Sequence, residues 1–250
     1  MSTWVLLRGL MRESRHWGDF PVLFQHAMDG QVVVTLDFPG NGCLNIQTSA
    51  SSVEEMADYA RSCLKQLGHA PPYQILALSL GAMVAVVWSE QHPEELEKMV
   101  LINTSLTHYS PFYHRLRPKN YLALILLLYG SATQRESLIL KLTSTRSHID
   151  NLKPILDQWI AYAEEFPITR GNILRQLKAA ISYRAKLTTP STPVLLLAGK
   201  QDQLVNVKCS MTLAKYWGCV LCLHPTASHD LPLDDSGWVI QQIKDWINFN

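Results

Sequence analysis

Short apolar segments alternate with helical segments along most of this 250-residue chain. The apolar segments are four or five residues long and nearly free of polar residues, which is typical of strands buried on both faces. Such alternation predicts a parallel sheet covered by helices on both sides. The chain is therefore predicted to be an α/β protein, a three-layer α/β/α sandwich with a mainly parallel sheet. The predicted strands are 4–8, 32–36, 74–77, 99–103, 194–198 and 220–224, and the helices between and after them are 16–26, 53–67, 80–91, 207–217 and 238–249.

Residues 104–189 interrupt the alternation, because helical periodicity continues there without a strand pattern. Four helices are predicted, at 121–128, 134–142, 152–166 and 173–184. We therefore expect a core domain made of residues 1–103 and 190–250, with a helical cap, or lid, inserted at 104–189. The apolar helix 121–128 could line an acyl pocket or pack against its neighbours, and packing is the simpler interpretation.

Composition excludes several classes of protein. Hydrophobic residues make up 47% of the chain and charged residues 17%, which is not the composition of a disordered protein. The net charge of +1 gives no overall field that would attract nucleic acid or an anionic membrane. The longest apolar run, 121–129, has 9 residues, whereas a membrane helix needs about 20. The run before Arg8 is too short for a signal peptide, so we expect a cytoplasmic protein without a membrane span, of unpredicted oligomeric state.

Ser79 lies where a predicted strand meets a predicted helix, in the segment ILALSLGA at 75–82. Sharp strand-to-helix turns carry the pattern G-x-S-x-G, because larger side chains two positions from the serine would collide with the neighbouring backbone. Ala77 and Gly81 occupy those positions here. Such a turn exposes the hydroxyl and directs a helix N-terminus toward developing negative charge. Although S-x-G alone is a weak signal, its position makes Ser79 a candidate nucleophile.

Two further candidates follow the last two predicted strands. Asp202 lies in GKQDQLV (199–205) and His229 in PTASHD (225–230), and loops at the carboxyl ends of parallel strands are where sites form. A serine nucleophile needs a base, and the base needs an acid to orient it. Asp202 alone could be a turn residue, and His229 alone a surface histidine. Their appearance after Ser79, on successive strand ends, favours a catalytic role.

Two other motifs suggest cofactors or metals. The G-x-G at 40–42 lacks the third glycine of a dinucleotide-binding loop. The C-x-x-C at 219–222 has no second pair of ligands for zinc and lies on a predicted strand, where residues three apart point to opposite faces. Five cysteines, an odd number, do not indicate a disulfide framework. We therefore expect no cofactor and no metal.

Taken together, these segments resemble the α/β-hydrolase fold family. RGLM at 8–11 resembles the family's oxyanion loop, usually H-G-x-G, and DFPGNG at 37–42 resembles its D-x-P-G-x-G loop. The likeness covers 4–103 and 190–249 but not the cap. It implies that Ser79 is the nucleophile, that His229 is the general base and that Asp202 orients the imidazole. It also implies that the backbone N–H groups of Leu10 and Leu80 form the oxyanion hole.

This chain departs from the family pattern at several positions. Arg8 stands where a histidine is usual, Met11 where glycine is frequent, and Ala82 where a second glycine is frequent. An oxyanion donor on the backbone does not depend on the side chain at position 8, but the hydrogen bonding around Arg8 must differ from that of the family. The chain also begins at what is normally the third strand, which predicts that the first hairpin is absent.

The resemblance implies a serine hydrolase that cleaves a carboxylic ester or thioester through an acyl-enzyme. The low content of charged residues and the apolar cap predict a small to medium hydrophobic acyl group. Carboxylesterases and acyl-carrier methyl-esterases of the family have a similar size. One alternative is a lyase or C–C bond enzyme that uses the same three residues. Another is a ligand-binding protein that keeps the fold without hydrolysis. The expected partner is a small-molecule substrate and not a nucleic acid.

Overall fold

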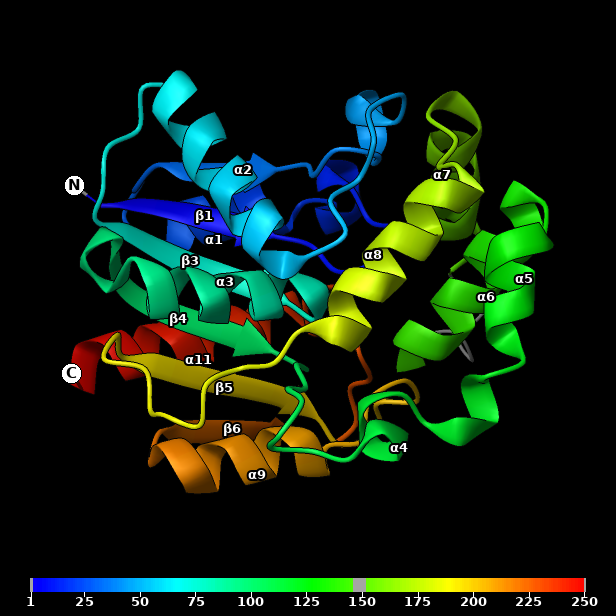
Figure 1. The fold of residues 1–250 in the computed structure, drawn as a ribbon. Helices are drawn as coiled ribbons and strands as arrows, with labels where there is room; N and C mark the ends of the chain where they lie inside the picture. The colour runs from blue at the N-terminus through cyan, green and yellow to red at the C-terminus, as the bar shows by residue number, and fades with distance from the viewer. Residues whose placement is uncertain (1, 146–151, 250) are drawn as a thin grey trace.

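The computed structural model describes residues 2–145 and 152–249 and contains a six-stranded sheet in which all paired strands are parallel (Figure 1). Its strand order is β2-β1-β3-β4-β5-β6. The six predicted strands are all present, with small shifts at their ends. They are β1 Thr3–Leu7, β2 Val33–Leu36, β3 Tyr73–Leu78, β4 Leu96–Ile102, β5 Val194–Gly199 and β6 Val220–His224.

Helices cover both faces of the sheet, as the alternation predicts. Successive side chains of a strand point to opposite faces, so Val5 and Leu7 of β1 pack in one hydrophobic cluster while Trp4 and Leu6 pack in another. The first cluster includes side chains of α2 Val53–Gln66, α3 Leu80–Gln91 and α9 Lys208–Trp217. The second includes side chains of α1 Phe20–Ala27 and α11 Ser236–Phe249. The structure is therefore the predicted three-layer sandwich.

The predicted helix 16–26 is divided in two. A short 3-10 helix, η1 Ser14–Trp17, ends at Gly18, and α1 begins at Phe20. Gly18 has φ 55°, a left-handed conformation that interrupts a right-handed helix and that glycine adopts at little cost. Pro21, in the first turn of α1, then favours a new helix start. The apolar spacing alone did not reveal this break.

Between β4 and β5 the described residues form helices and no strand. The helices are α4 Phe112–Arg115, η4 Pro118–Asn120, α5 Ala123–Tyr129, α6 Ala132–Thr143, α7 Lys153–Glu165 and α8 Arg170–Ser182. The helical insertion was predicted, although the short α4 was not. Figure 1 shows α5 to α8 beyond the carboxyl ends of the strands, at the edge toward which the strand arrows point. We call residues 104–189 the cap, and its two boundaries remain a prediction.

The cap has its own small apolar centre. Leu140 of α6 and Trp159 of α7 pack together with Leu152, which joins the two helices side by side. Among the described residues, no helix is both long and apolar enough to cross a bilayer. The part of the predicted helix 152–166 that is observed, α7, begins one residue later and ends one residue earlier.

Candidate active site

Ser79 sits in the sharp turn between β3 and α3. Its φ is 55°, a backbone conformation that costs a non-glycine residue of the order of 1–3 kcal/mol. A Cβ at Gly81 would lie 2.6 Å from the carbonyl oxygen of Leu7, so the turn requires a glycine there. Ala77 is fully buried and paired in register with Leu7. The small residues on either side of Ser79 therefore allow the turn to pack against the end of β1.

Asp202 and His229 meet at the carboxyl ends of β5 and β6. Nδ1 of His229 lies 2.7 Å from Oδ2 of Asp202, and both side chains are buried. An ionised carboxylate only accepts hydrogen bonds, so Nδ1 carries the proton and Nε2 of the neutral ring is left as an acceptor. The other carboxylate oxygen of Asp202 accepts the N–H groups of Leu204 at 2.7 Å and Val205 at 2.9 Å. These bonds fix the carboxylate toward the imidazole.

Asn103 holds the loop of His229 against the sheet, a role that sequence reasoning missed. Its Nδ2 donates to the carbonyl oxygens of Ser228 at 3.0 Å and His229 at 2.8 Å, and its Oδ1 accepts the N–H of Gly199 at 3.0 Å. A Cβ at Gly199 would lie 2.3 Å from the carbonyl oxygen of Ser228, so the end of β5 and this loop are in close contact. A polar residue that follows a buried strand was the only available signal.

The carboxylate changes the protonation of His229. Burial lowers the pKa of this imidazole, but the negative charge and hydrogen bond of Asp202 outweigh burial, so its pKa is raised above 6.5. A buried imidazolium beside a carboxylate is stabilised because the pair is neutral as a whole. The arrangement therefore suits a base that takes up a proton during a reaction.

A cavity of about 450 Å³ lies between the sheet and the cap. Ser79 and His229 line it, together with Leu10 and Leu80, the two predicted oxyanion residues. Asp202 does not line the cavity but contacts His229, which does. Apolar side chains of the cap make much of the remaining wall, and they include Leu124, Leu127, Ile139, Leu142, Leu177 and Ile181. Helix α5 thus lines the cavity, so packing alone does not explain its apolar sequence.

Arg8 is buried and forms an ion pair with Asp230. Its two terminal nitrogens lie 3.2 Å and 2.6 Å from the two carboxylate oxygens, and its guanidinium lies 4.6 Å from the centre of the Trp17 ring. Asp230 directly follows His229. The pair therefore joins the segment after β1 to the loop that carries the imidazole, and it supplies the partner that the sequence left open for Arg8.

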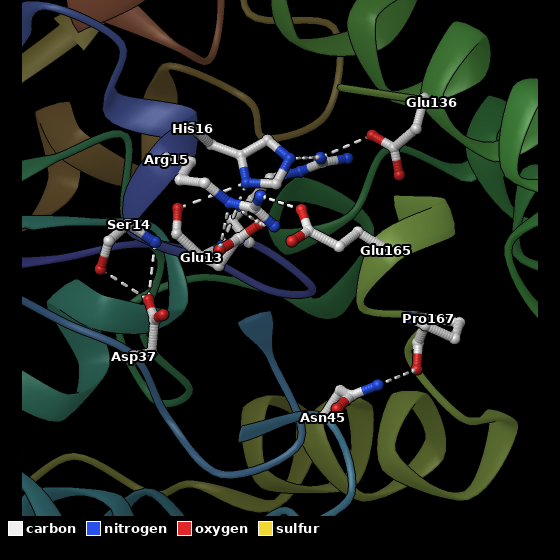
Figure 2. A network of polar contacts seen from close by, with 10 residues as sticks. Glu13, Ser14, Arg15, His16, Asp37, Asn45, Glu136, Glu165 and Pro167 are labelled. Carbon is white, nitrogen blue, oxygen red and sulfur yellow. Dashed lines mark hydrogen bonds and ion pairs between the residues drawn. The ribbon is translucent and has the colours of Figure 1, made fainter. Parts of the chain in front are cut away.

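The segment after β1 also contacts the cap. The N–H of Met11 donates to Gln176 of α8 at 2.9 Å, and Arg12 pairs with Glu136 of α6 at 2.6 Å. Figure 2 shows the surrounding network, in which Arg15 reaches Glu165 of α7 at 2.5 Å. Sequence reasoning identified none of these contacts, because each joins residues more than 100 positions apart.

His16 occupies the centre of this network (Figure 2). Its Nε2 lies 2.6 Å from Nη1 of Arg12, and its ring makes edge contacts with Trp159 and Tyr162 of α7. Burial, together with the positive charges of Arg12 and Arg8, lowers the pKa of His16 well below 6.5. The imidazole is therefore neutral at pH 7 and accepts a hydrogen bond from the guanidinium.

A group of three residues could in principle hold a cation. His92, Glu94 and Glu95 each place one ligand atom within 4.8 Å of the others. The carboxylate of Glu95 already accepts hydrogen bonds from Arg61 and Trp88, and Glu94 is exposed. The group lies at the start of β4, on the edge of the sheet away from Ser79, so it takes no part in the candidate site.

The parallel sheet with helices on both faces agrees with the protein family that the chain matches. The family model described as alpha/beta hydrolase fold matches residues 5–236. The chain belongs to the α/β-hydrolase fold family.

Individual proteins that resemble this chain share a quarter or less of its residues. The bifunctional biotin biosynthesis protein BioHC of Teredinibacter turnerae is 25% identical over 233 residues, which cover 85% of this chain and 38% of that protein. The chain thus matches well under half the length of this curated relative. The enol-lactonase of Burkholderia xenovorans LB400 superposes with a TM-score of 0.81 at 16% identity, covering 99% of this chain and 91% of that one. A thermophilic esterase of Thermogutta terrifontis superposes with a TM-score of 0.78 at 18% identity, covering 99% and 90%. These likenesses concern the fold.

Proposed function

We propose that the protein is a serine esterase that hydrolyses a carboxylic ester or thioester through an acyl-enzyme. The observation that carries the proposal is that His229, whose Nδ1 lies 2.7 Å from Oδ2 of Asp202, lines the same cavity as Ser79. Ser79 is the nucleophile, His229 the general base and Asp202 the residue that orients the imidazole. These roles agree with the family and with the order of the three residues along the chain.

The reaction follows from this arrangement in two steps. Nε2 of His229 takes the Ser79 hydroxyl proton as Oγ attacks the acyl carbon, and the imidazolium then gives that proton to the departing alcohol or thiol. Water attacks the acyl-enzyme with the same base and releases the acid. In both steps the negative oxygen is held by the N–H groups of Leu10 and Leu80, and one such donor is worth about 2.7–4 kcal/mol of barrier.

The walls of the cavity favour a substrate with an apolar acyl group. The aliphatic residues of α5, α6 and α8 can bury such a group, and each buried methylene contributes about 0.8 kcal/mol. The polar groups near Ser79, chiefly Arg8 and Asp230, are already paired with each other. We therefore expect small to medium acyl esters to be better substrates than esters with a charged acyl group.

Active-site labelling tests the nucleophile. A fluorophosphonate probe is expected to label the wild type, and Ser79→Ala is expected to abolish the labelling and to reduce hydrolysis of p-nitrophenyl esters by at least a thousandfold. Ser210→Ala, at a buried serine of α9 outside the cavity, is the matched control and should still be labelled.

Other outcomes assign other functions. Labelling of Ser79 without turnover of any ester, at any acyl length, would favour a lyase that uses the same residues. Absence of both labelling and turnover would favour a ligand-binding protein and would contradict the proposal. Full esterase activity in a His229→Ala variant would refute the assignment of the base.

A further inference from the structure

The cavity opens at one side of the cap. Three residues both line the cavity and are exposed, namely Phe112 of α4 (72% exposed), Tyr121 before α5 (39%) and Ile181 of α8 (68%). Such side chains lie where the cavity reaches the surface of the protein. The mouth of the cavity therefore lies between α4, α5 and α8.

The surface around this mouth is unusually apolar. All seven residues of α5 are apolar or aromatic, and none of them is buried. Leu122 and Ile125 are 78% and 56% exposed. Arg170 of α8 stacks on Tyr129 of α5 at 4.8 Å, which joins the two helices into one surface. We call this surface the mouth face, and it consists of the exposed side chains Phe112, Tyr113, Tyr121, Leu122, Ile125, Leu126, Tyr129, Leu174 and Ile181.

The charged residues of the segments that contain these helices are all basic. Residues 104–131 and 166–189, which contain α4, α5 and α8, hold eight Lys and Arg residues and no Asp or Glu. Over the whole cap, 12 basic residues face five acidic ones, so the cap carries a formal charge of +7 and the rest of the chain −6. Two of the cap's acidic residues, Glu136 and Glu165, are paired with arginines of the segment after β1. The net charge of +1 therefore conceals a strong separation of charge.

We propose that the mouth face binds the surface of an anionic lipid bilayer. Exposed aliphatic and tyrosine side chains on segments that also carry exposed Lys and Arg are the composition of protein surfaces that lie in the interface of a membrane. The apolar side chains enter the boundary between headgroups and acyl chains, and the basic residues contact the anionic headgroups. An acidic protein would meet the charge equally well, but it would not explain so many exposed aliphatic side chains around an opening.

Binding at this face has a consequence for the substrate. The mouth would open directly onto the bilayer, so an acyl ester dissolved in the membrane could reach Ser79 without crossing water. This consequence rests on the proposed esterase function, whereas binding of the bilayer does not. The two can therefore be tested separately.

Vesicle sedimentation tests the binding. The full chain carrying Ser79→Ala, which prevents lipid hydrolysis, is mixed with vesicles of phosphatidylcholine alone or of phosphatidylcholine with phosphatidylglycerol. We expect at least tenfold stronger partitioning onto the anionic vesicles, and weaker binding as salt increases. Each basic residue near an anionic surface contributes about fivefold, or about 1 kcal/mol.

Two sets of variants locate the surface. The first set combines Arg175→Gln, Lys178→Gln and Arg184→Gln. It removes three exposed positive charges from α8 and the segment after it, and it should lower partitioning at least tenfold. The second set combines Leu122→Gln and Ile125→Gln, at the start of α5 and within it. These residues do not line the cavity, and their replacement should lower partitioning at least fivefold. The controls are Lys65→Gln with Lys215→Gln, and Val22→Gln, which change exposed residues of the core. Circular dichroism of each variant shows that it folds. The same substitutions made in the chain that retains Ser79 should leave ester turnover unchanged.

Three results would overturn the proposal. The first is equal partitioning onto neutral and anionic vesicles, or none onto either. The second is binding to polyglutamate without binding to vesicles, which would assign the face to an acidic protein. The third is a dimer in sedimentation velocity that becomes monomeric when Leu122 and Ile125 are replaced. That result would assign the mouth face to contact with a second copy of the chain. If ester hydrolysis fails but vesicle binding is found, the esterase proposal falls and this one stands.

Discussion

At the scale of single residues, the site depends on groups whose properties are set by their neighbours. Ser79 adopts its left-handed backbone because Gly81 lets the turn approach the end of β1. His229 has a raised pKa because Asp202 is held facing it by two backbone N–H groups. Neither property belongs to serine or histidine as such. Both follow from a few contacts that position the side chain.

The pH dependence of turnover reports the His229–Asp202 pair. A general base works when neutral, so kcat/KM should rise with pH through the raised pKa of His229, with a midpoint above 6.5. Asp202→Asn removes the charge that raises this pKa, so the midpoint should fall, and kcat should drop about ten-thousandfold by analogy with other triads. Steady-state kinetics over a range of pH measures both effects.

Asp29→Asn, at an exposed position of the core domain, is the control for the loss of a negative charge. It should leave the pH dependence of kcat/KM unchanged. If the wild type showed a midpoint below 6.5, or if Asp202→Asn left the midpoint unchanged, His229 would not be the group that limits turnover at low pH. The assignment of Asp202 would then have to be given up.

At the scale of elements, the segment between β1 and α1 connects the core to the cap. It carries Met11, Arg12 and Arg15, which contact α8, α6 and α7 in turn. The helical pattern at 16–26 was read as one element, yet η1 and the turn at Gly18 give this segment the shape that these contacts need. The segment also carries Leu10, so the cap and the proposed oxyanion hole are mechanically linked.

The stability of this connection should depend on pH through His16. Its pKa is lowered in the folded protein, so the unfolded chain binds a proton more readily. The free energy of unfolding is then full above about pH 6.5 and falls as the pH decreases below that value. Each unit of pKa difference amounts to about 1.36 kcal/mol. Urea unfolding between about pH 5 and pH 7.5 measures the loss.

His16→Gln removes the titrating group, and its free energy of unfolding should vary less over the same range. His26→Gln, at an exposed position of α1, keeps His16 and should follow the wild type. Equal losses in the wild type and in His16→Gln would show that another group controls the stability, since only the variant lacks the buried imidazole.

At the scale of the whole molecule, residues from the two ends of the chain form one site. Arg8 and Asp230 are 222 positions apart and are both buried. Their pairing stabilises the approach of the loop after β1 to the loop of His229, which places the proposed nucleophile, base and oxyanion donors around one cavity. The distribution of charge is also a property at this scale, because the basic cap and the acidic core cancel in the total.

A double-mutant cycle tests the Arg8–Asp230 pair. Arg8→Met leaves a buried carboxylate without its partner and should lower the free energy of unfolding by about 3–5 kcal/mol. Arg8→Met combined with Asp230→Asn removes both charges and should recover most of that loss. Urea unfolding of the four proteins gives the coupling energy. Additive losses would show that the two side chains do not stabilise each other.

The sequence by itself was sufficient for the architecture and for the candidate triad. Buried parallel strands are near-continuous apolar runs, and each βα turn exposes its residues at the same edge of the sheet. Ser79, Asp202 and His229 could therefore be expected close together from local patterns alone. The expected division into a core domain (1–103 and 190–250) and an inserted cap (104–189) also rests on these local patterns of strands and helices.

Only the tertiary structure decided what surrounds these residues. The partner of Arg8, the role of Asn103 and the contacts of His16 all join distant segments, and no local pattern encodes such a pairing. Helix α5 illustrates the same limit, since an apolar sequence is compatible both with packing and with lining a cavity. The total charge of +1 argued against an anionic membrane, yet the charged residues of the segments that contain α4, α5 and α8, which border the opening, are all basic. The composition of a protein surface depends on which residues become neighbours, and the tertiary fold decides that.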